Sequence, residues 1–167
     1  MDLNLADSSA TEALGQALAR TMPGAVATQG AVLYLQGELG AGKTTCVRSL
    51  LRTLGVTGLV RSPTYTLVET YRLDRLTCVH VDLYRLQALT EVDELGLRDL
   101  VGPGCLLLVE WPEKGGLALP PADLELTLRY SGEARRAAFR ASTPLGSLWL
   151  DNLGHDTSLS FYVSNLT

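Results

Sequence analysis

The spacing of apolar residues along the chain predicts both strands and helices. Continuous apolar runs over residues 31–36 and 105–110 are typical of strands covered on both faces of a sheet. Apolar side chains that return every three or four residues instead indicate a helix with one buried face. On this pattern and its flanking signals, helices are expected over residues 9–22, 47–54 and 90–101.

Local signals predict where these helices begin and end. Ser9 and Glu12 have the spacing of a capping box, so we expect the first helix to begin at Ser9. Gly55 is a natural stop for the second helix. The third is expected to begin at Thr90 and to end at Gly102-Pro103-Gly104.

The remaining apolar positions predict two antiparallel hairpins. One pairs residues 66–72 with 77–84, and the other pairs residues 123–130 with 137–141. Together with the helices they indicate one α/β domain whose sheet is largely parallel and ends in an antiparallel C-terminal hairpin. We place this domain at residues 1–142. Residues 143–167 form a C-terminal tail, docked or disordered, and the pattern leaves its structure open.

Composition narrows the class of protein. The chain has 167 residues, of which 46% are hydrophobic and 19% charged, as in globular proteins. Its net charge of −4 argues against tight autonomous binding to nucleic acid. No apolar run approaches the ~20 residues that span a bilayer, and no secretory signal is visible, so a cytoplasmic protein is expected. The cysteines lack zinc-site spacing and are expected to be buried thiols: Cys46, Cys78 and Cys105.

A glycine-rich segment between the first buried strand and the second helix matches the pattern G-x-x-x-x-G-K-[ST]. Its glycines let backbone N–H groups turn inward around phosphates, and the helix that follows adds the positive end of its dipole. Lys43 can reach the β- and γ-phosphates, Thr44 can bind Mg²⁺, and Thr45 can contact the α-phosphate. The segment predicts a P-loop NTPase-like three-layer fold that binds ATP and Mg²⁺. It comprises Gly37, Glu38, Leu39, Gly40, Ala41, Gly42, Lys43 and Thr44.

Two carboxylates end predicted strands and are candidates for the magnesium site. Glu110 ends the strand at residues 105–110, where a Walker B acid would lie, and Asp82 shares a strand face with His80 and Tyr84. The alternative for each acid is a solvated carboxylate at a strand end. His80 has no partner at metal-ligand spacing, so we interpret it as a structural histidine.

Two further features have both a functional and a structural interpretation. Thr64 lies in Ser62-Pro63-Thr64-Tyr65-Thr66, at the distance from the P-loop where many such proteins carry a mobile switch. A plain turn that enters a strand fits the same residues. Trp111 follows Glu110 directly and could stack on a nucleotide ring or fill the core.

Four sequence blocks in this order resemble the TsaE family. They are Gly37-Glu-Leu-Gly-Ala-Gly-Lys-Thr-Thr45, Ser62-Pro-Thr-Tyr-Thr-Leu-Val-Glu69, His80-Val-Asp-Leu-Tyr-Arg-Leu86 and Leu108-Val-Glu-Trp-Pro-Glu113. The resemblance covers roughly residues 11–140. It implies an ATPase, weak alone and stimulated by partners, that supports threonylcarbamoyladenosine formation on tRNA. The implied partners are the proteins TsaB and TsaD, whose transferase complex it binds and resets, with tRNA contacted only through that complex.

The resemblance also implies roles for individual residues. Lys43 holds phosphates, Thr44 and Glu110 bind Mg²⁺, and Asp82 supports the metal or the attacking water. Thr64 lies in the switch-like segment. Trp111 lines the nucleotide or partner surface, and Thr11 in the N-terminal helix and Gly132 in the C-terminal hairpin border the nucleotide pocket.

The residues alone leave three other functions open. A small-molecule kinase would fit the length, but it usually needs an arginine-bearing lid, and Arg135 and Arg136 fall in a predicted hairpin. A GTPase would fit Asp93-Glu-Leu-Gly96, but this segment lies within a predicted helix and no guanine-reading [NT]-K-x-D motif occurs. A module that binds nucleotide without hydrolysing it also remains open.

Overall fold

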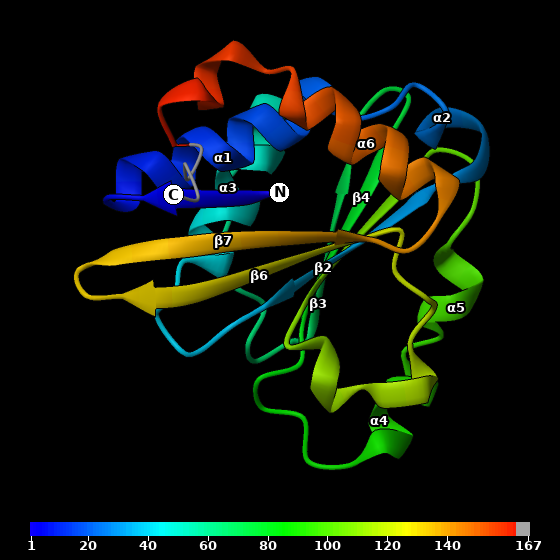
Figure 1. Ribbon diagram of the computed structural model, residues 1–167. Coiled ribbons are helices and arrows are strands. Elements are labelled where there is room, and N and C mark those ends of the chain that lie inside the picture. The colour runs from blue at the N-terminus through cyan, green and yellow to red at the C-terminus, as the bar shows by residue number, and fades with distance from the viewer. Residues whose placement is uncertain (163–167) are drawn as a thin grey trace.

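A seven-stranded mixed sheet forms the centre of the computed structural model, which describes residues 1–162 (Figure 1). The strand order is β1-β7-β6-β2-β5-β4-β3, and the four neighbours β6, β2, β5 and β4 are parallel. β7 and β1 on one side and β3 on the other are antiparallel, so the fold class is confirmed. The strands are β1 (Asp2–Leu5), β2 (Ala31–Gln36), β3 (Val68–Arg72), β4 (Thr77–Asp82), β5 (Cys105–Glu110), β6 (Leu124–Ser131) and β7 (Ala134–Ala141).

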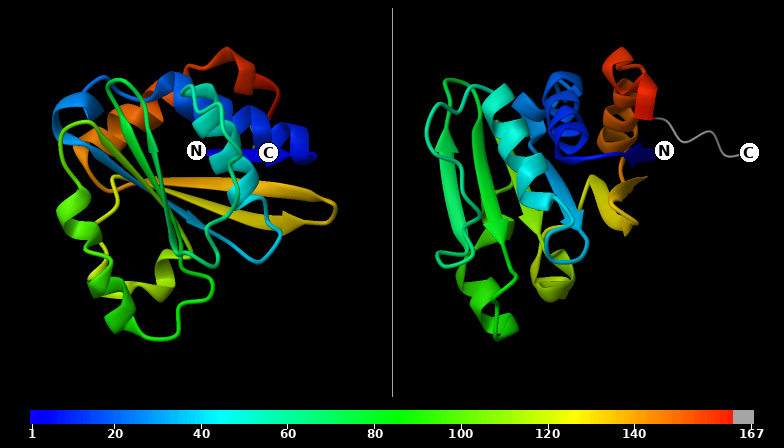
Figure 2. Two further views of the ribbon diagram at one scale, coloured as in Figure 1. Left: turned by 180° about the vertical axis from the view of Figure 1, so that it is seen from behind. Right: turned by 90° about the vertical axis from the view of Figure 1, so that its left-hand side faces the viewer.

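Helices cover both faces of this sheet and give the expected three layers. One face carries α1, α3 and α6, which lie together in both views of Figure 2, and the other is covered by α4 and α5. The α-helices are α1 (Ser8–Thr21), α2 (Val26–Gln29), α3 (Lys43–Thr53), α4 (Leu89–Glu94), α5 (Leu97–Leu100) and α6 (Pro144–Gly154). The 3₁₀ turns are η1 (Pro112–Lys114), η2 (Gly116–Ala118) and η3 (Thr157–Tyr162).

The two faces of β2 and β5 enter two separate hydrophobic cores. Leu33 of β2 and Leu108 of β5 pack with α1 and α3, whereas Val32 and Leu107 pack with α4 and α5. Successive strand residues point to opposite faces, so continuous apolar runs are required at these positions. The strands predicted at residues 31–36 and 105–110 are confirmed.

The N-terminus of α1 differs from the predicted capping box. α1 begins at Ser8, and the side chain of Asp7 accepts a hydrogen bond of 2.9 Å from the Ala10 backbone N–H. Ser9 lies inside the helix and donates to the same Asp7 carboxylate. Asp7, two residues before Ser9, is therefore the N-cap, and its negative charge is favourable at the positive end of the helix dipole.

The helix predicted over residues 90–101 is wrong as a single element. α4 ends at Glu94 and α5 begins at Leu97, because Gly96 has φ +59, in the left-handed region. A helix does not continue through that conformation. The sequence pattern also missed β1, which is too short to show an alternation, and α2, which is a single turn.

The residues after Thr143 form a helix that joins the main core. In α6 the Trp149 side chain is fully buried and its Nε1–H donates 3.0 Å to the Leu18 carbonyl of α1. Thr143 caps α6 through the Gly146 N–H, and Pro144 occupies its first turn. The predicted tail comprised residues 143–167. Its last five residues, 163–167, lie outside the described residues. In the described chain no helix has the length and apolarity to cross a membrane.

The strand register brings three strand ends to one edge of the sheet. Leu35 near the end of β2 lies opposite Glu110 at the end of β5, and Glu110 lies opposite Asp82 at the end of β4. In a parallel sheet, loops that follow such neighbouring ends share one crevice. The candidate residues Asp82 and Glu110 meet there.

Candidate functional site

The P-loop connects β2 to α3 and owes its shape to glycines. Gly37, Gly40 and Gly42 have φ values of +137, +79 and +109, which other residues rarely adopt. A Cβ atom at Gly37 would also lie 2.2 Å from the Leu128 carbonyl oxygen of β6. The loop therefore needs glycine for its backbone angles and for its close contact with the neighbouring strand.

Lys43 is nearly fully buried and folds back onto the loop that it follows. Its Nζ donates to the carbonyl oxygens of Gly37 at 2.6 Å and Glu38 at 2.9 Å, and lies 3.9 Å from the centroid of the Trp111 ring. Desolvation lowers the pKa of this ammonium group, while the nearby carboxylate of Glu110 opposes the shift. The chain thus places a desolvated cation inside a phosphate-binding loop.

A hydrogen-bonded chain connects the P-loop helix to two strands. The Thr44 hydroxyl donates 2.9 Å to Glu110 Oε2, and Glu110 Oε1 lies 2.9 Å from Nε2 of His80. Glu110 and His80 are both buried. Because Glu110 is an acceptor when ionised, His80 is the donor in this contact. The carboxylate is held at both oxygens and faces the helix N-terminus.

Asp82 is engaged by the segment that contains Thr64. Its Oδ2 accepts hydrogen bonds from the hydroxyls of Ser62 and, at 2.9 Å, of Thr64, while Oδ1 accepts from the Tyr84 backbone N–H at 2.9 Å. Leu67, at the end of this segment, has φ +62, a strained value for a leucine. The structure therefore connects the switch-like segment to a strand-end carboxylate.

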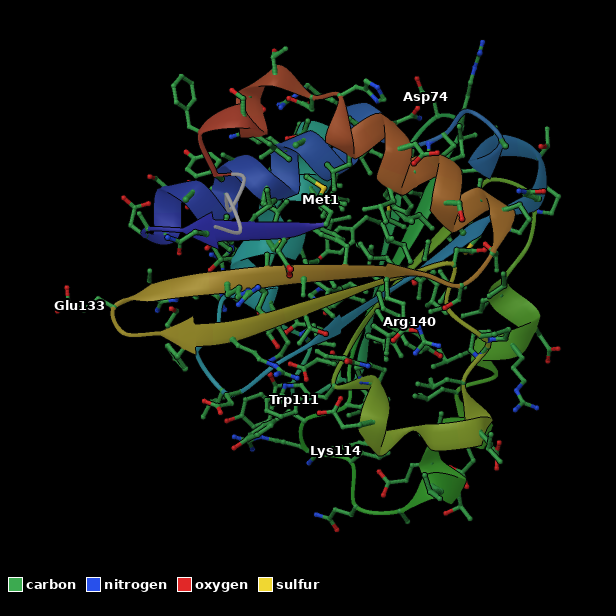
Figure 3. All side chains as sticks on the ribbon, viewed as in Figure 1. Met1, Asp74, Trp111, Lys114, Glu133 and Arg140 are labelled. Carbon is green, nitrogen blue, oxygen red and sulfur yellow. The ribbon has the colours of Figure 1, made fainter. Side chains whose placement is uncertain are left out.

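An open cavity of about 240 Å³ brings these residues together beside the P-loop. Trp111 lies against it in the left-handed region (φ +59), with its ring 5.1 Å from that of Tyr84. Figure 3 shows Trp111 close to Lys114 at this end of the molecule. The cavity is lined by Leu39, Gly40, Gly42, Lys43, Thr44, Thr45, Ser62, Thr64, Asp82, Tyr84, Glu110 and Trp111.

Thr11 and Gly132 were both expected to border the nucleotide, and the structure places them differently. The Thr11 methyl group lies 3.1 Å from the position that a Cβ of Gly42 would occupy, so Thr11 abuts the P-loop. Gly132 lies in the β6–β7 turn beside Glu133, which Figure 3 shows at the tip of the hairpin, away from Trp111. The hairpin contacts the P-loop through Tyr130, whose hydroxyl donates to the Leu39 carbonyl at 3.1 Å.

The donors around the cavity fit Mg²⁺ carried by a nucleotide. Mg²⁺ prefers oxygen ligands and usually binds through one or two carboxylates and phosphate oxygens. Thr44, Glu110 and Asp82 supply a hydroxyl and two carboxylates. Within residues 1–162 no three His, Cys, Asp or Glu residues cluster to hold a metal by themselves. These three side chains therefore suit a metal ion whose remaining ligands are phosphate oxygens of a nucleotide.

Sequence reasoning missed three members of this site. His80 was interpreted as structural, yet it contacts Glu110; Ser62 joins Thr64 on Asp82; and Tyr84 packs on Trp111. The shared strand face of His80, Asp82 and Tyr84 was a usable signal. It could not identify the partner of each side chain, because those partners lie on other elements.

Three comparisons relate the chain to known proteins. The family model described as "Threonylcarbamoyl adenosine biosynthesis protein TsaE" matches residues 5–138. The tRNA threonylcarbamoyladenosine biosynthesis protein TsaE of Haemophilus influenzae is 43% identical over 115 residues, which are 69% of this chain and 73% of that protein. The corresponding protein of Bacillus subtilis is 36% identical over 112 residues, which are 67% and 70% of the two chains.

Among solved structures, the crystal structure of Bacillus subtilis YdiB superposes with a TM-score of 0.72 at 28% identity. The superposition covers 92% of this chain and 93% of that chain. It therefore includes residues beyond those that the family model matches.

Proposed function

The chain belongs to the TsaE family, and on that premise we propose that it is a Mg²⁺-dependent ATPase of tRNA threonylcarbamoyladenosine biosynthesis. In this proposal it acts in the cytoplasm, where it binds and resets the complex of TsaB and TsaD. It contacts tRNA only through that complex. It hydrolyses ATP weakly by itself and faster when the partners are bound.

The contact between Thr44 and Glu110 is the observation that carries the ATPase proposal. A P-loop hydroxyl and a carboxylate from the next parallel strand lie within 2.9 Å of each other, facing the same cavity as Lys43. P-loop NTPases use such a pair to hold the magnesium ion of the bound nucleotide. This pair supports an ATPase site that holds Mg²⁺, and it favours that proposal over a site that only binds a phosphate.

Each residue has a role in this proposal. Backbone N–H groups of the P-loop surround the phosphates, and Lys43 leaves the carbonyls of Gly37 and Glu38 to neutralise the β- and γ-phosphates. Thr44 and Glu110 hold Mg²⁺, which, when bound, stabilises the charge that develops on the phosphate oxygens. Asp82 lies beside Glu110, where it would support the metal or the attacking water.

Weak activity without partners fits the arrangement of Lys43 and Asp82. The ammonium group of Lys43 is engaged by two carbonyls and the Trp111 ring, and Asp82 by Ser62 and Thr64. Both residues must exchange these contacts for contacts to nucleotide or water. A partner that moves the segment around Thr64 would make the exchange easier, which supports the expected stimulation.

The structure supports a kinase less than it supports an ATPase. Arg136 pairs with Asp2 at 3.2 Å, and the Arg135 guanidinium carbon lies 5.1 Å from the centroid of the Tyr130 ring. Both arginines therefore lie on the hairpin and do not form a lid. Asp93 lies within α4 and away from a strand end, so the D-x-x-G match gives no support to a GTPase.

ATP hydrolysis tests the proposal directly. We would measure phosphate release with Mg²⁺ from the chain alone, after addition of the cognate TsaB–TsaD complex, and with Glu110→Ala in both conditions. Stimulation by the partners that is lost in the variant is the expected result. Equal, negligible turnover with and without the partners would contradict the proposal, and phosphate transfer to a metabolite would favour a kinase. Tighter competitive binding of GTP than of ATP would overturn the choice of adenine nucleotide.

A further inference from the structure

His80 is a fully buried polar residue in the interior of β4. Its neighbours along the strand are Val79 and Val81, and it lies opposite Leu108 of β5 and Glu69 of β3. A buried polar atom that lacks a hydrogen-bond partner lowers the stability of the fold. The Nδ1 of His80 has no hydrogen-bond partner among the described residues. The polarity of Nδ1 therefore contributes no hydrogen bond to the fold.

Among residues 1–162, the one hydrogen bond of the His80 side chain points to the proposed metal site. Nε2 lies 2.9 Å from Glu110 Oε1, and the opposite oxygen, Oε2, accepts from Thr44 at 2.9 Å. A carboxylate bound at one oxygen by a fixed donor has lost rotation about its last side-chain torsion. Its other oxygen is then held toward the P-loop helix.

We infer that His80 is a positioning residue that orients Glu110 for Mg²⁺, an inference that rests on the proposed function. It donates through Nε2 to Oε1 and leaves Oε2 directed at Thr44. It does not line the cavity beside the P-loop. Partners of this kind around a metal ligand typically change metal affinity by roughly 10- to 100-fold.

A residue with this role affects the binding of Mg²⁺ but not the binding of nucleotide without metal. The test therefore measures the two kinds of binding separately. Binding of a fluorescent ADP analogue is titrated at increasing Mg²⁺ concentration and, separately, in EDTA. We expect His80→Phe to raise the Mg²⁺ concentration at half-effect by roughly 10- to 100-fold. Affinity in EDTA should stay unchanged, because the P-loop contacts to phosphate do not involve His80.

Two further variants keep the test decisive. His80→Gln retains an N–H donor and should recover most of the Mg²⁺ response. This variant also keeps the inference testable if His80→Phe does not fold. Cys78→Ala is the matched control, since Cys78 is a buried residue on the same face of β4 two positions earlier, outside the site. It should leave both measurements unchanged.

The outcomes distinguish this inference from the proposed function. An unchanged Mg²⁺ midpoint in His80→Phe, or equal losses of affinity with Mg²⁺ and in EDTA, would overturn the positioning role while the ATPase proposal stands. A midpoint raised in His80→Gln as much as in His80→Phe would overturn it as well. Wild-type protein that binds the analogue without any response to Mg²⁺ would overturn both.

Discussion

The ammonium group of Lys43 lies 3.9 Å from the centroid of the Trp111 ring, so the P-loop lysine and the residue after Glu110 form a cation–π contact. The same ammonium group donates to two P-loop carbonyls. Phosphates that enter the loop compete for all three contacts. The environment of Trp111 should therefore change when nucleotide binds, and this gives a direct optical test.

Tryptophan fluorescence should report nucleotide binding through Trp111 alone. The chain has two tryptophans, and the second, Trp149, is fully buried in α6. We expect ADP with Mg²⁺ to change the emission of the wild-type protein and to leave that of Trp111→Phe unchanged. The measurement is the tryptophan emission of both proteins during titration with ADP and Mg²⁺ under identical conditions. A change in emission that is as large in Trp111→Phe as in the wild type would contradict the contact.

Lys43→Ala should slow ATP hydrolysis by roughly 100-fold or more, because the variant loses a cation that stabilises charge on the transferred phosphoryl group. The measurement is steady-state phosphate release in the presence of the TsaB–TsaD complex. Lys114→Ala is the matched control, because Lys114 is the other lysine and donates to the Tyr84 carbonyl outside the P-loop. Similar losses in both variants would argue against a specific role for Lys43.

Asp82→Ala should loosen the segment that contains Ser62 and Thr64. Both hydroxyls lose their shared acceptor, the Asp82 carboxylate. We expect faster amide hydrogen exchange across residues 62–67, with exchange in α6 unchanged as an internal reference. Unaltered exchange in the segment would show that other contacts hold it.

Trp149→Ala should destabilise the protein by about 3–5 kcal/mol, through the cavity that it leaves and the lost hydrogen bond to Leu18. Urea unfolding at equilibrium measures this free energy. The neighbouring Leu148 is 47% exposed, so Leu148→Ala should stay within about 0.5 kcal/mol of wild type. A cost below about 1 kcal/mol for Trp149→Ala would show that α6 contributes little to the core.

The buried cysteines make stability fall at alkaline pH. Burial raises the pKa of the Cys46 thiol from 9.0 to about 12, because the thiolate is disfavoured in the core. A raised folded-state pKa contributes stability that is fully present below pH 9 and is lost as pH rises toward 12. Thermal unfolding between pH 8 and 10.5 should show this loss, and Cys46→Ala should reduce its slope. A thiol reagent at pH 8 should label the unfolded chain but not the native protein.

The sequence by itself determined the features whose parts are neighbours along the chain. The P-loop is one such feature, since eight consecutive residues carry its glycines, its lysine and its hydroxyl. The buried strands β2 and β5 are another, because a short apolar run needs no distant partner to be identified. The resemblance to the TsaE family also followed from local blocks, and the family model that matches residues 5–138 confirmed it.

Only the tertiary structure decided which side chains meet. Thr44 and Glu110 are 66 residues apart, and they touch because β2 and β5 pair in one register. The short strand β1 and the docking of α6 also depended on tertiary contacts. The pattern of apolar and charged residues along the sequence indicates which residues can be buried. The partner of each residue depends on strand register and helix packing, which are set by the free energy of the whole fold.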